Sequence, residues 1–149
     1  MLVIEAMRRP LVSVTPETTL GEAARTMADQ GVGALIVVGN DGRVAGIVTD
    51  RDLVVRAMAK EIPLDARVDM VMTTDVVTLD VSSDLRAAYP LFRRHAVRRL
   101  PIVDDGKPMG VISTDDLVMD ISADLADVAR PITGEVIFGH HEPDVPSVR

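Results

Sequence analysis

Residues 46–54, which read Gly-Ile-Val-Thr-Asp-Arg-Asp-Leu-Val, decide the fold of this chain because nearly the same stretch occurs twice. Sixty-four positions later, residues 110–118 read Gly-Val-Ile-Ser-Thr-Asp-Asp-Leu-Val. Each copy has a glycine, a short β-branched run, a hydroxyl residue, an aspartate three positions further on, and an apolar start typical of a helix. This internal repeat predicts two copies of one structural unit that share a core.

The repeat extends well beyond this motif. An offset of 65 aligns residues 7–38 with 72–103, and an offset of 64 aligns residues 42–56 with 106–120. We therefore divide the chain into a first repeat (1–60), a linker (61–69), a second repeat (70–122) and a C-terminal extension (123–149). Most identities are apolar or glycine, as expected if each copy builds the same core. The identities fall at Met7, Val12, Leu20, Ala23, Val32, Leu35, Val38, Gly42, Gly46, Asp52, Leu53 and Val54.

The first copy predicts the order β-α-β-β-α. Residues 11–14 alternate like a short strand, and Thr18 offers a capping hydroxyl to a helix that ends near Gly31 or Gly33. Residues 34–38 and 44–48 predict two strands joined by the turn 40–42, and residues 50–59 predict a second helix.

The second copy repeats this order. Residues 76–79 predict a strand, and Ser83 caps a helix whose apolar face holds Leu85, Ala88, Tyr89 and Phe92. Pro90 lies inside this helix and should kink it. Residues 100–103 and 109–112 predict a hairpin, and residues 114–121 predict the closing helix. Beyond the repeat, residues 134–138 predict a strand and residues 142–149 a loose end.

Composition limits what the chain can do. A net charge of −7 and 2% aromatic residues oppose binding to nucleic acid. The absence of cysteine excludes disulfides, thiolate catalysis and cysteine-bound metals. No apolar run approaches the roughly 18–20 residues of a membrane span, and no secretory leader is evident. We expect a cytoplasmic protein that binds neither nucleic acid nor membranes.

The repeated pattern resembles the CBS domain, and the two copies together resemble a CBS pair, or Bateman module. The resemblance covers about residues 7–122. Residues 100–104, Leu-Pro-Ile-Val-Asp, strengthen it, because similar segments are frequent at the middle strand of CBS domains. Residues 49–54 are similar to small stand-alone bacterial CBS proteins, including hypoxic-response types. It implies an α/β fold of tandem repeats, packed through their sheets with pseudo-two-fold symmetry. It also implies a homodimer formed through apolar helix faces.

Thr49 and Asp52 stand at the predicted start of a helix, where exposed amides attract anions. A threonine hydroxyl can donate to phosphate, whereas an aspartate can only accept, so its natural partners are the hydroxyls of a ribose. The two residues together suggest a nucleotide clamp. The alternative is structural: Thr49 caps its helix and Asp52 complements the helix dipole.

The resemblance places adenosine-type ligands in two clefts between the repeats. In the first cleft, Thr49 and Asp52 face a set drawn from the second repeat: Met72, Asp75, Val77, Val97, Arg98 and Arg99. In the second, Ser113 and Asp116 face Met7, Pro10, Val12, Val32, Gly33 and Ala34. Arg98 and Arg99 stand at the positions that Gly33 and Ala34 occupy in the first repeat. Because arginine can hold a phosphate through two donors, we expect the first cleft to take a phosphorylated ligand. Asp75 would oppose a phosphate placed beside it.

Other chemistry has little support in the sequence. No nucleophile motif, phosphate loop or carboxylate pair is evident, so we expect no enzyme, no catalytic residue and no cofactor. His140 and His141, with Glu142 and Asp144, could hold a metal, but adjacent residues are poor ligand geometry. We therefore expect a regulatory module that senses AMP, ATP or a related adenosyl ligand and signals to an unknown effector protein. The alternative is an interaction module without a ligand that acts through its dimer surface.

Overall fold

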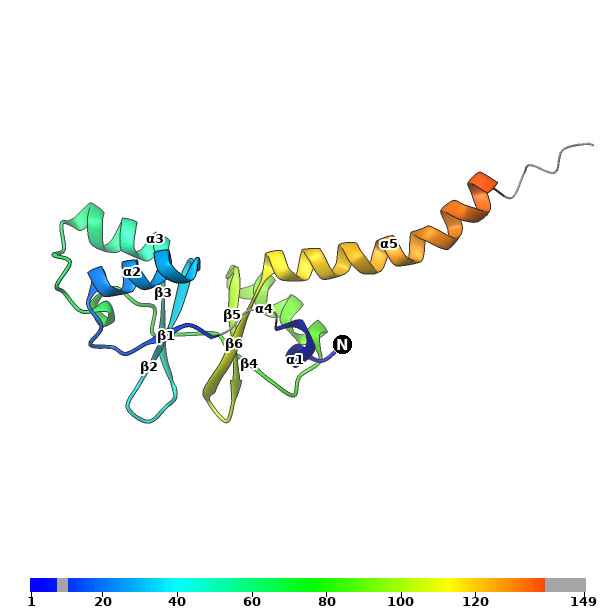
Figure 1. The fold of residues 1–149 in the computed structure, drawn as a ribbon. Helices are drawn as coiled ribbons and strands as arrows, with labels where there is room; N and C mark the ends of the chain where they lie inside the picture. Colours follow the sequence, from blue (N-terminus) through cyan, green and yellow to red (C-terminus); the bar gives the residue numbers. More distant parts are fainter. Residues whose placement is uncertain (8–10, 139–149) are drawn as a thin grey trace, which may run out of the picture. The chain divides into compact units, whose positions relative to one another are not determined.

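The computed structural model describes residues 1–7 and 11–138, and side chains as far as residue 130 (Figure 1). The chain divides into two compact units, residues 1–114 and 115–149. The first unit holds two small three-stranded sheets with helices, so the fold is mixed α/β as predicted. The predicted loose end, residues 142–149, lies outside the described residues, as do His140 and His141.

The two sheets have the same topology. The first has the order β1-β2-β3, and the second has the order β4-β5-β6. In each, the first strand is parallel to the second and the second is antiparallel to the third. The strands are β1 (Ser13–Val14), β2 (Ala34–Val38), β3 (Val44–Thr49), β4 (Leu79–Asp80), β5 (Arg99–Asp104) and β6 (Lys107–Ser113). The edge strands β1 and β4 are shorter than predicted.

Helices alternate with these strands along the chain. The α-helices are α1 (Val3–Ala6), α2 (Leu20–Gln30), α3 (Asp50–Asp52), α4 (Ala88–His95) and α5 (Thr114–Phe138). After α3 the chain continues as a π-helical turn, Leu53–Ala57, and a 3₁₀ turn, Met58–Lys60. Two further 3₁₀ turns are Val68–Met70 and Leu85–Ala87. α1 was not predicted, because four residues carry too short a pattern to reveal a helix.

Both predicted caps are displaced by one residue. Thr19, not Thr18, caps α2: its hydroxyl accepts from the Glu22 amide at 3.2 Å, and the Glu22 carboxylate accepts from the Thr19 amide at 3.1 Å. This reciprocal pair is stronger than a lone hydroxyl. Asp84, not Ser83, accepts from the Arg86 amide at 2.9 Å at the start of the Leu85–Ala87 turn.

The second repeat departs from its predicted helix at two positions. Pro90 is the third residue of α4, in the first helical turn, where an amide needs no intrahelical acceptor, so the proline is accommodated. Tyr89 is 41% exposed, whereas Leu85, Ala88 and Phe92 are buried as predicted. The prediction that Tyr89 belongs to the buried face was wrong.

α5 is much longer than the predicted closing helix and includes residues 134–138. The strand predicted there is wrong. A short apolar run does not distinguish strand from helix by itself, and the preceding helix is extended through it at little cost. No described helix is long and apolar enough to cross a membrane.

The core is built from the positions that the two repeats share. Leu20, Ala23 and Leu35 in the first repeat are at most 2% exposed, and so are their counterparts Ala88 and Leu100 in the second. Strand residues Val48 and Ile112 are fully buried at the equivalent strand position. Identical apolar residues at an offset of 65 therefore fill equivalent buried positions in the two repeats.

The start of the chain pairs with the second repeat, and the linker 61–69 pairs with the first repeat. The Leu20 amide donates to the Ala66 carbonyl at 2.8 Å, and the Leu85 amide donates to the Met1 carbonyl at 3.0 Å. These two bonds are related by the repeat offset. Residues 61–69, which the sequence suggests as a linker, thus supply backbone partners to the first repeat.

The glycine that recurs at positions 46 and 110 lies where a segment of the chain crosses close to the third strand of each sheet. A Cβ on Gly46 would lie 2.6 Å from Met72 Sδ and 2.8 Å from the Thr73 carbonyl oxygen. A Cβ on Gly110 would lie 2.8 Å from Met7 Sδ, and Met7 is the counterpart of Met72. Only glycine lets the crossing segment lie this close to the third strand.

We expect Gly46→Ala to lower the free energy of unfolding by about 1–3 kcal/mol, because the Thr73 backbone cannot move without breaking its pairing with Ile47. Gly110→Ala should cost less, since the methyl group meets only the flexible Met7 side chain. Urea denaturation of both variants measures the difference. Equal losses would contradict this explanation.

Candidate functional site

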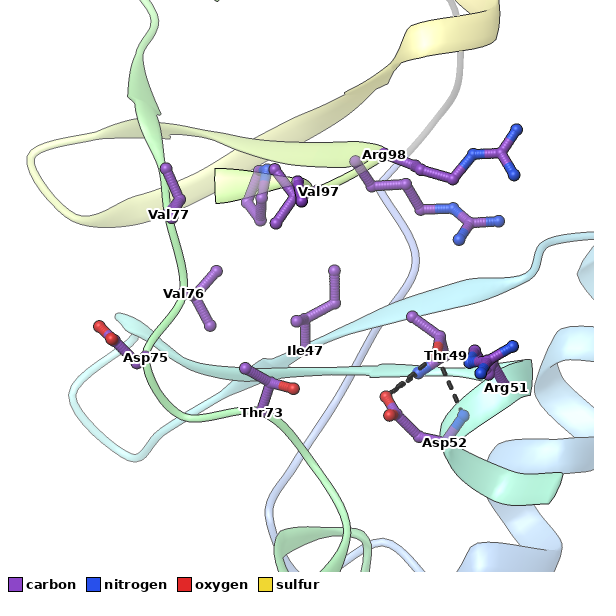
Figure 2. A pocket seen from close by; sticks show the side chains of 13 residues that line it. Ile47, Thr49, Arg51, Asp52, Thr73, Asp75, Val76, Val77, Val97 and Arg98 are labelled. Carbon is purple, nitrogen blue, oxygen red and sulfur yellow. Dashed lines mark hydrogen bonds between the residues drawn. The ribbon is translucent and has the colours of Figure 1, made fainter. Parts of the chain in front are cut away.

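A cavity of about 300 Å³ lies within the first unit, between the two repeats (Figure 2). Its walls come from the end of β3, the start of α3, the segment before β4 and the start of β5. The lining residues are Ile47, Thr49, Arg51, Asp52, Thr73, Asp75, Val76, Val77, Ala96, Val97, Arg98, Arg99 and Pro101.

Thr49 and Asp52 are held together by a reciprocal cap at the junction of β3 and α3. The Thr49 amide and hydroxyl donate to Asp52 Oδ2 at 2.9 and 3.0 Å. The Asp52 amide donates to the Thr49 hydroxyl at 3.2 Å. This is the structural role that the sequence offered as the alternative to ligand binding.

The cap determines what each group can still offer to a ligand. The single hydroxyl proton of Thr49 is used on Asp52, so Thr49 has no proton left for a phosphate while the cap is intact. Asp52 keeps acceptor capacity on Oδ1, which lies 4.0 Å from Arg56 Nη1. Its side chain is 16% exposed. Asp52 can therefore cap α3 and accept from a hydroxyl donor at the same time.

The wall opposite this cap is fixed by backbone pairing. Ile47 and Thr73 exchange two hydrogen bonds, at 3.0 Å from the Ile47 amide and 2.9 Å from the Thr73 amide. This bridge joins β3 of the first repeat to the segment that enters the second. Figure 2 shows Val76, Val77 and Val97 together at one end of the cavity, which gives that end an apolar wall with the Asp75 carboxylate beside it.

The other end of the cavity is cationic. Figure 2 shows Arg51 and Arg98 on the same side as Thr49, away from the valines. Arg99 begins β5, and its guanidinium flanks Gly33: a Cβ on that glycine would lie 3.0 Å from Arg99 Nη2. Asp75 lies at the far end from Arg98 and Thr49, so its carboxylate does not oppose an anion bound there.

Seven predicted residues of the first cleft line this one cavity: Thr49, Asp52, Asp75, Val77, Val97, Arg98 and Arg99. Met72 does not line it and contacts the Gly46 position instead. Prediction missed Ile47, Arg51, Thr73, Val76, Ala96 and Pro101. Arg51 could have been found from its place inside the repeated motif between Thr49 and Asp52.

The second predicted cleft is described only in part. Ser113 pairs with Arg99 at the end of β6, Ala34 pairs with Thr49, and the Gly33 carbonyl accepts from the Asp50 amide at 3.0 Å. Val12 packs against the first repeat's core. None of these lines the cavity above. Asp116 belongs to the second unit, and Pro10 lies outside the described residues, so this cleft stays a prediction.

Among the residues that the structure describes, no three histidine or carboxylate side chains cluster as metal ligands. The histidine pair considered from sequence is not among them. The charges around the cavity are instead three guanidinium groups and two carboxylates. In a chain of net charge −7, this is a local excess of positive charge. The arrangement can bind a ligand that is apolar at one end and anionic at the other.

The model of the CBS domain family matches residues 3–58 and 67–123. The chain therefore belongs to the CBS domain family and carries two CBS domains. It is 35% identical over 116 residues to the CBS domain-containing protein YhcV of Bacillus subtilis, a match that covers 78% of this chain and 82% of YhcV. It is 26% identical over 114 residues to hypoxic response protein 1 of Mycobacterium tuberculosis, covering 76% and 80% of the two chains.

Among solved structures, a CBS domain protein from Pyrobaculum aerophilum in complex with AMP superposes with a TM-score of 0.76 at 28% identity. The superposition covers 85% of this chain and 99% of that one. These matches confirm the predicted family and tandem fold. Three other curated relatives are longer than the aligned region, which spans 26% to 63% of their length.

We expect Thr49→Ala to lower the free energy of unfolding by about 1 kcal/mol, because it removes the hydroxyl that caps α3. Thr49→Ser keeps the hydroxyl and should retain most of the stability. Urea denaturation of both variants without any ligand measures this. A Thr49→Ala variant as stable as the original chain would show that the cap is dispensable.

Proposed function

We propose that this protein is a regulatory module, not an enzyme, that binds an adenine nucleotide or a related adenosyl ligand between its two CBS repeats. The observation that carries this proposal is the cavity with valines at one end, arginines at the other and the capped Asp52 between them. AMP and ATP are the ligands that this order of groups suits best.

Each part of a nucleotide has a matching wall. The base fits between Val76, Val77 and Val97, where apolar side chains cover its faces. The ribose hydroxyls donate to Asp52 Oδ1, the carboxylate oxygen that the cap leaves available. The phosphate is held by arginines, whose forked donors suit phosphate oxygens better than the engaged Thr49 hydroxyl does.

The family supports this proposal without fixing the ligand. The similar protein from Pyrobaculum aerophilum was solved in complex with AMP. A ligand in this cavity would touch Asp52 from the first repeat and Arg98 from the second. It would therefore favour whichever arrangement of the repeats binds it better, and an effector protein would respond to that shift.

A homodimer is part of the proposal. In the first unit, Val54, Val55 and Met58 are 55%, 45% and 68% exposed. The counterparts of the first two in the second repeat, Val118 and Met119 in the second unit, are 60% and 68% exposed. Apolar residues that are exposed at equivalent positions of both repeats suit burial against a second copy.

The second candidate function, an interaction module without a ligand, is favoured by those same exposed residues. It would use the apolar helix faces and leave the cavity empty. The two candidates differ in one measurable property, which is saturable binding of a small molecule at Asp52.

Calorimetric titration of the full chain with AMP, ATP and S-adenosylmethionine tests ligand binding. We expect saturable binding that Asp52→Asn weakens about tenfold or more, because the amide nitrogen cannot accept from a ribose hydroxyl. Asparagine still caps α3 through its carbonyl oxygen, and Asp65→Asn, outside the cavity, is the matched control. No binding of any ligand at millimolar concentration would favour the interaction module.

We expect Val54→Glu to shift the chain from dimer to monomer, because it places a charge in an apolar interface. Light scattering after size-exclusion chromatography measures the mass. Glu61→Gln, at an exposed residue beyond this patch, is the control. A Val54→Glu chain that keeps the mass of the original chain would exclude this face as the dimer interface.

A further inference from the structure

We propose that the cavity selects ligands with more than one phosphate, and that Arg51 is the residue that distinguishes them from AMP. This inference rests on the proposed function, since it requires a nucleotide in the same cavity. Arg51 is one of the lining residues that the sequence did not predict. Its position and its lack of an ion-pair partner carry the argument.

The three cations of the cavity are absent from the equivalent positions of the other repeat. The offset of 64 places Asp115 at the position of Arg51, and the offset of 65 places Gly33 and Ala34 at those of Arg98 and Arg99. The shared fold therefore does not require arginine at any of them. Arginine at all three positions of one cavity is a property of that cavity.

Two of these cations form no ion pair in the described part of the chain, although a carboxylate lies near one of them: Asp50 Oδ2 and Arg99 Nη2 are each 3.0 Å from the Cβ position of Gly33. In the described part of the chain, neither Arg51 nor Arg99 has an acidic group within ion-pair distance. Other arginines do: Arg67 lies 2.7 Å from Asp69, and Arg43 lies 3.5 Å from Asp105. Asp52 and Asp75 also line the cavity, but neither forms an ion pair with these two guanidinium groups. A bound anion would supply the missing charge.

The two arginines differ in burial, and this difference suggests which part of a bound ligand each of them meets. Arg99 is half-buried beside Gly33, whereas Arg51 is exposed at the rim. The Arg51 amide donates to the Asp50 carboxylate at 2.9 Å, which fixes its backbone and leaves the long side chain to reach outward. With the ribose at Asp52, Arg99 holds the nearest phosphate and Arg51 holds the phosphates beyond it.

This arrangement separates ligands by charge. A di- or triphosphate brings more negative charge to the rim than a monophosphate, and each charged hydrogen bond there is stronger than a neutral one. A sulfonium ligand such as S-adenosylmethionine brings a positive charge to the same place and is disfavoured. ATP and ADP are therefore expected to bind more tightly than AMP, and AMP more tightly than adenosine.

The test is calorimetric titration of the full chain with adenosine, AMP, ADP and ATP. We expect ATP to bind at least about tenfold more tightly than AMP, a ratio that should fall about tenfold in Arg51→Ala. Arg86→Ala removes the same charge outside the cavity and should keep the original ratio. Higher salt should weaken ATP binding more than adenosine binding.

The outcomes separate this inference from the proposed function. If AMP binds as tightly as ATP, or if Arg51→Ala leaves their ratio unchanged, the inference is wrong and the nucleotide site stands. If none of the four compounds binds, both fail together. Equal loss of the ratio in Arg51→Ala and Arg86→Ala would also overturn it, because the effect would then be one of overall charge.

Discussion

The structure depends on the close crossing of two backbones at Gly46. There the segment that enters the second repeat pairs with β3 of the first, through two hydrogen bonds between Ile47 and Thr73. The missing side chain at Gly46 is what permits this distance. Within the first unit, the Leu85 amide of the second repeat also donates to the Met1 carbonyl at the start of the chain. Each repeat therefore forms backbone hydrogen bonds with the other. Neither half could therefore be removed without leaving unpaired backbone groups in its partner.

The cavity is a direct consequence of this crossing. After Thr73 the chain runs along the face of β3 before it reaches β4, and Val76 and Val77 line the space that is left. The strand that the crossing holds in place ends at Thr49, where the cap with Asp52 turns the chain into α3. The apolar wall and the polar junction are thus positioned by the same backbone pairing, so the residues that would contact the proposed ligand have fixed places.

Much of this could be predicted from local pattern, and the rest depended on contacts between distant residues. The strands 34–38 and 44–49, with the turn at Gly42, follow from apolar runs and turn chemistry. The resemblance to CBS domains named seven of the residues that line the cavity. α1 was missed because four residues carry too short a pattern. The crossing at Gly46 and the pairing of Met1 with Leu85 were missed because the paired residues are far apart in sequence. Residues 134–138 were misjudged because five residues do not reveal their period. Thr49 was expected to donate to phosphate, but only coordinates show that its proton is already used on Asp52.

The pattern of repeated and unrepeated residues separates architecture from recognition. Gly46, Asp52 and Leu53 recur in the second copy, and the structure gives the first two a role in backbone packing and capping. Residues that serve the shared fold must recur, because both copies meet the same geometric demands. Arginines at 51, 98 and 99 do not recur, and no shared geometric demand explains them. If the proposed function holds, the difference between two otherwise equivalent repeats at these positions is where ligand specificity is to be sought.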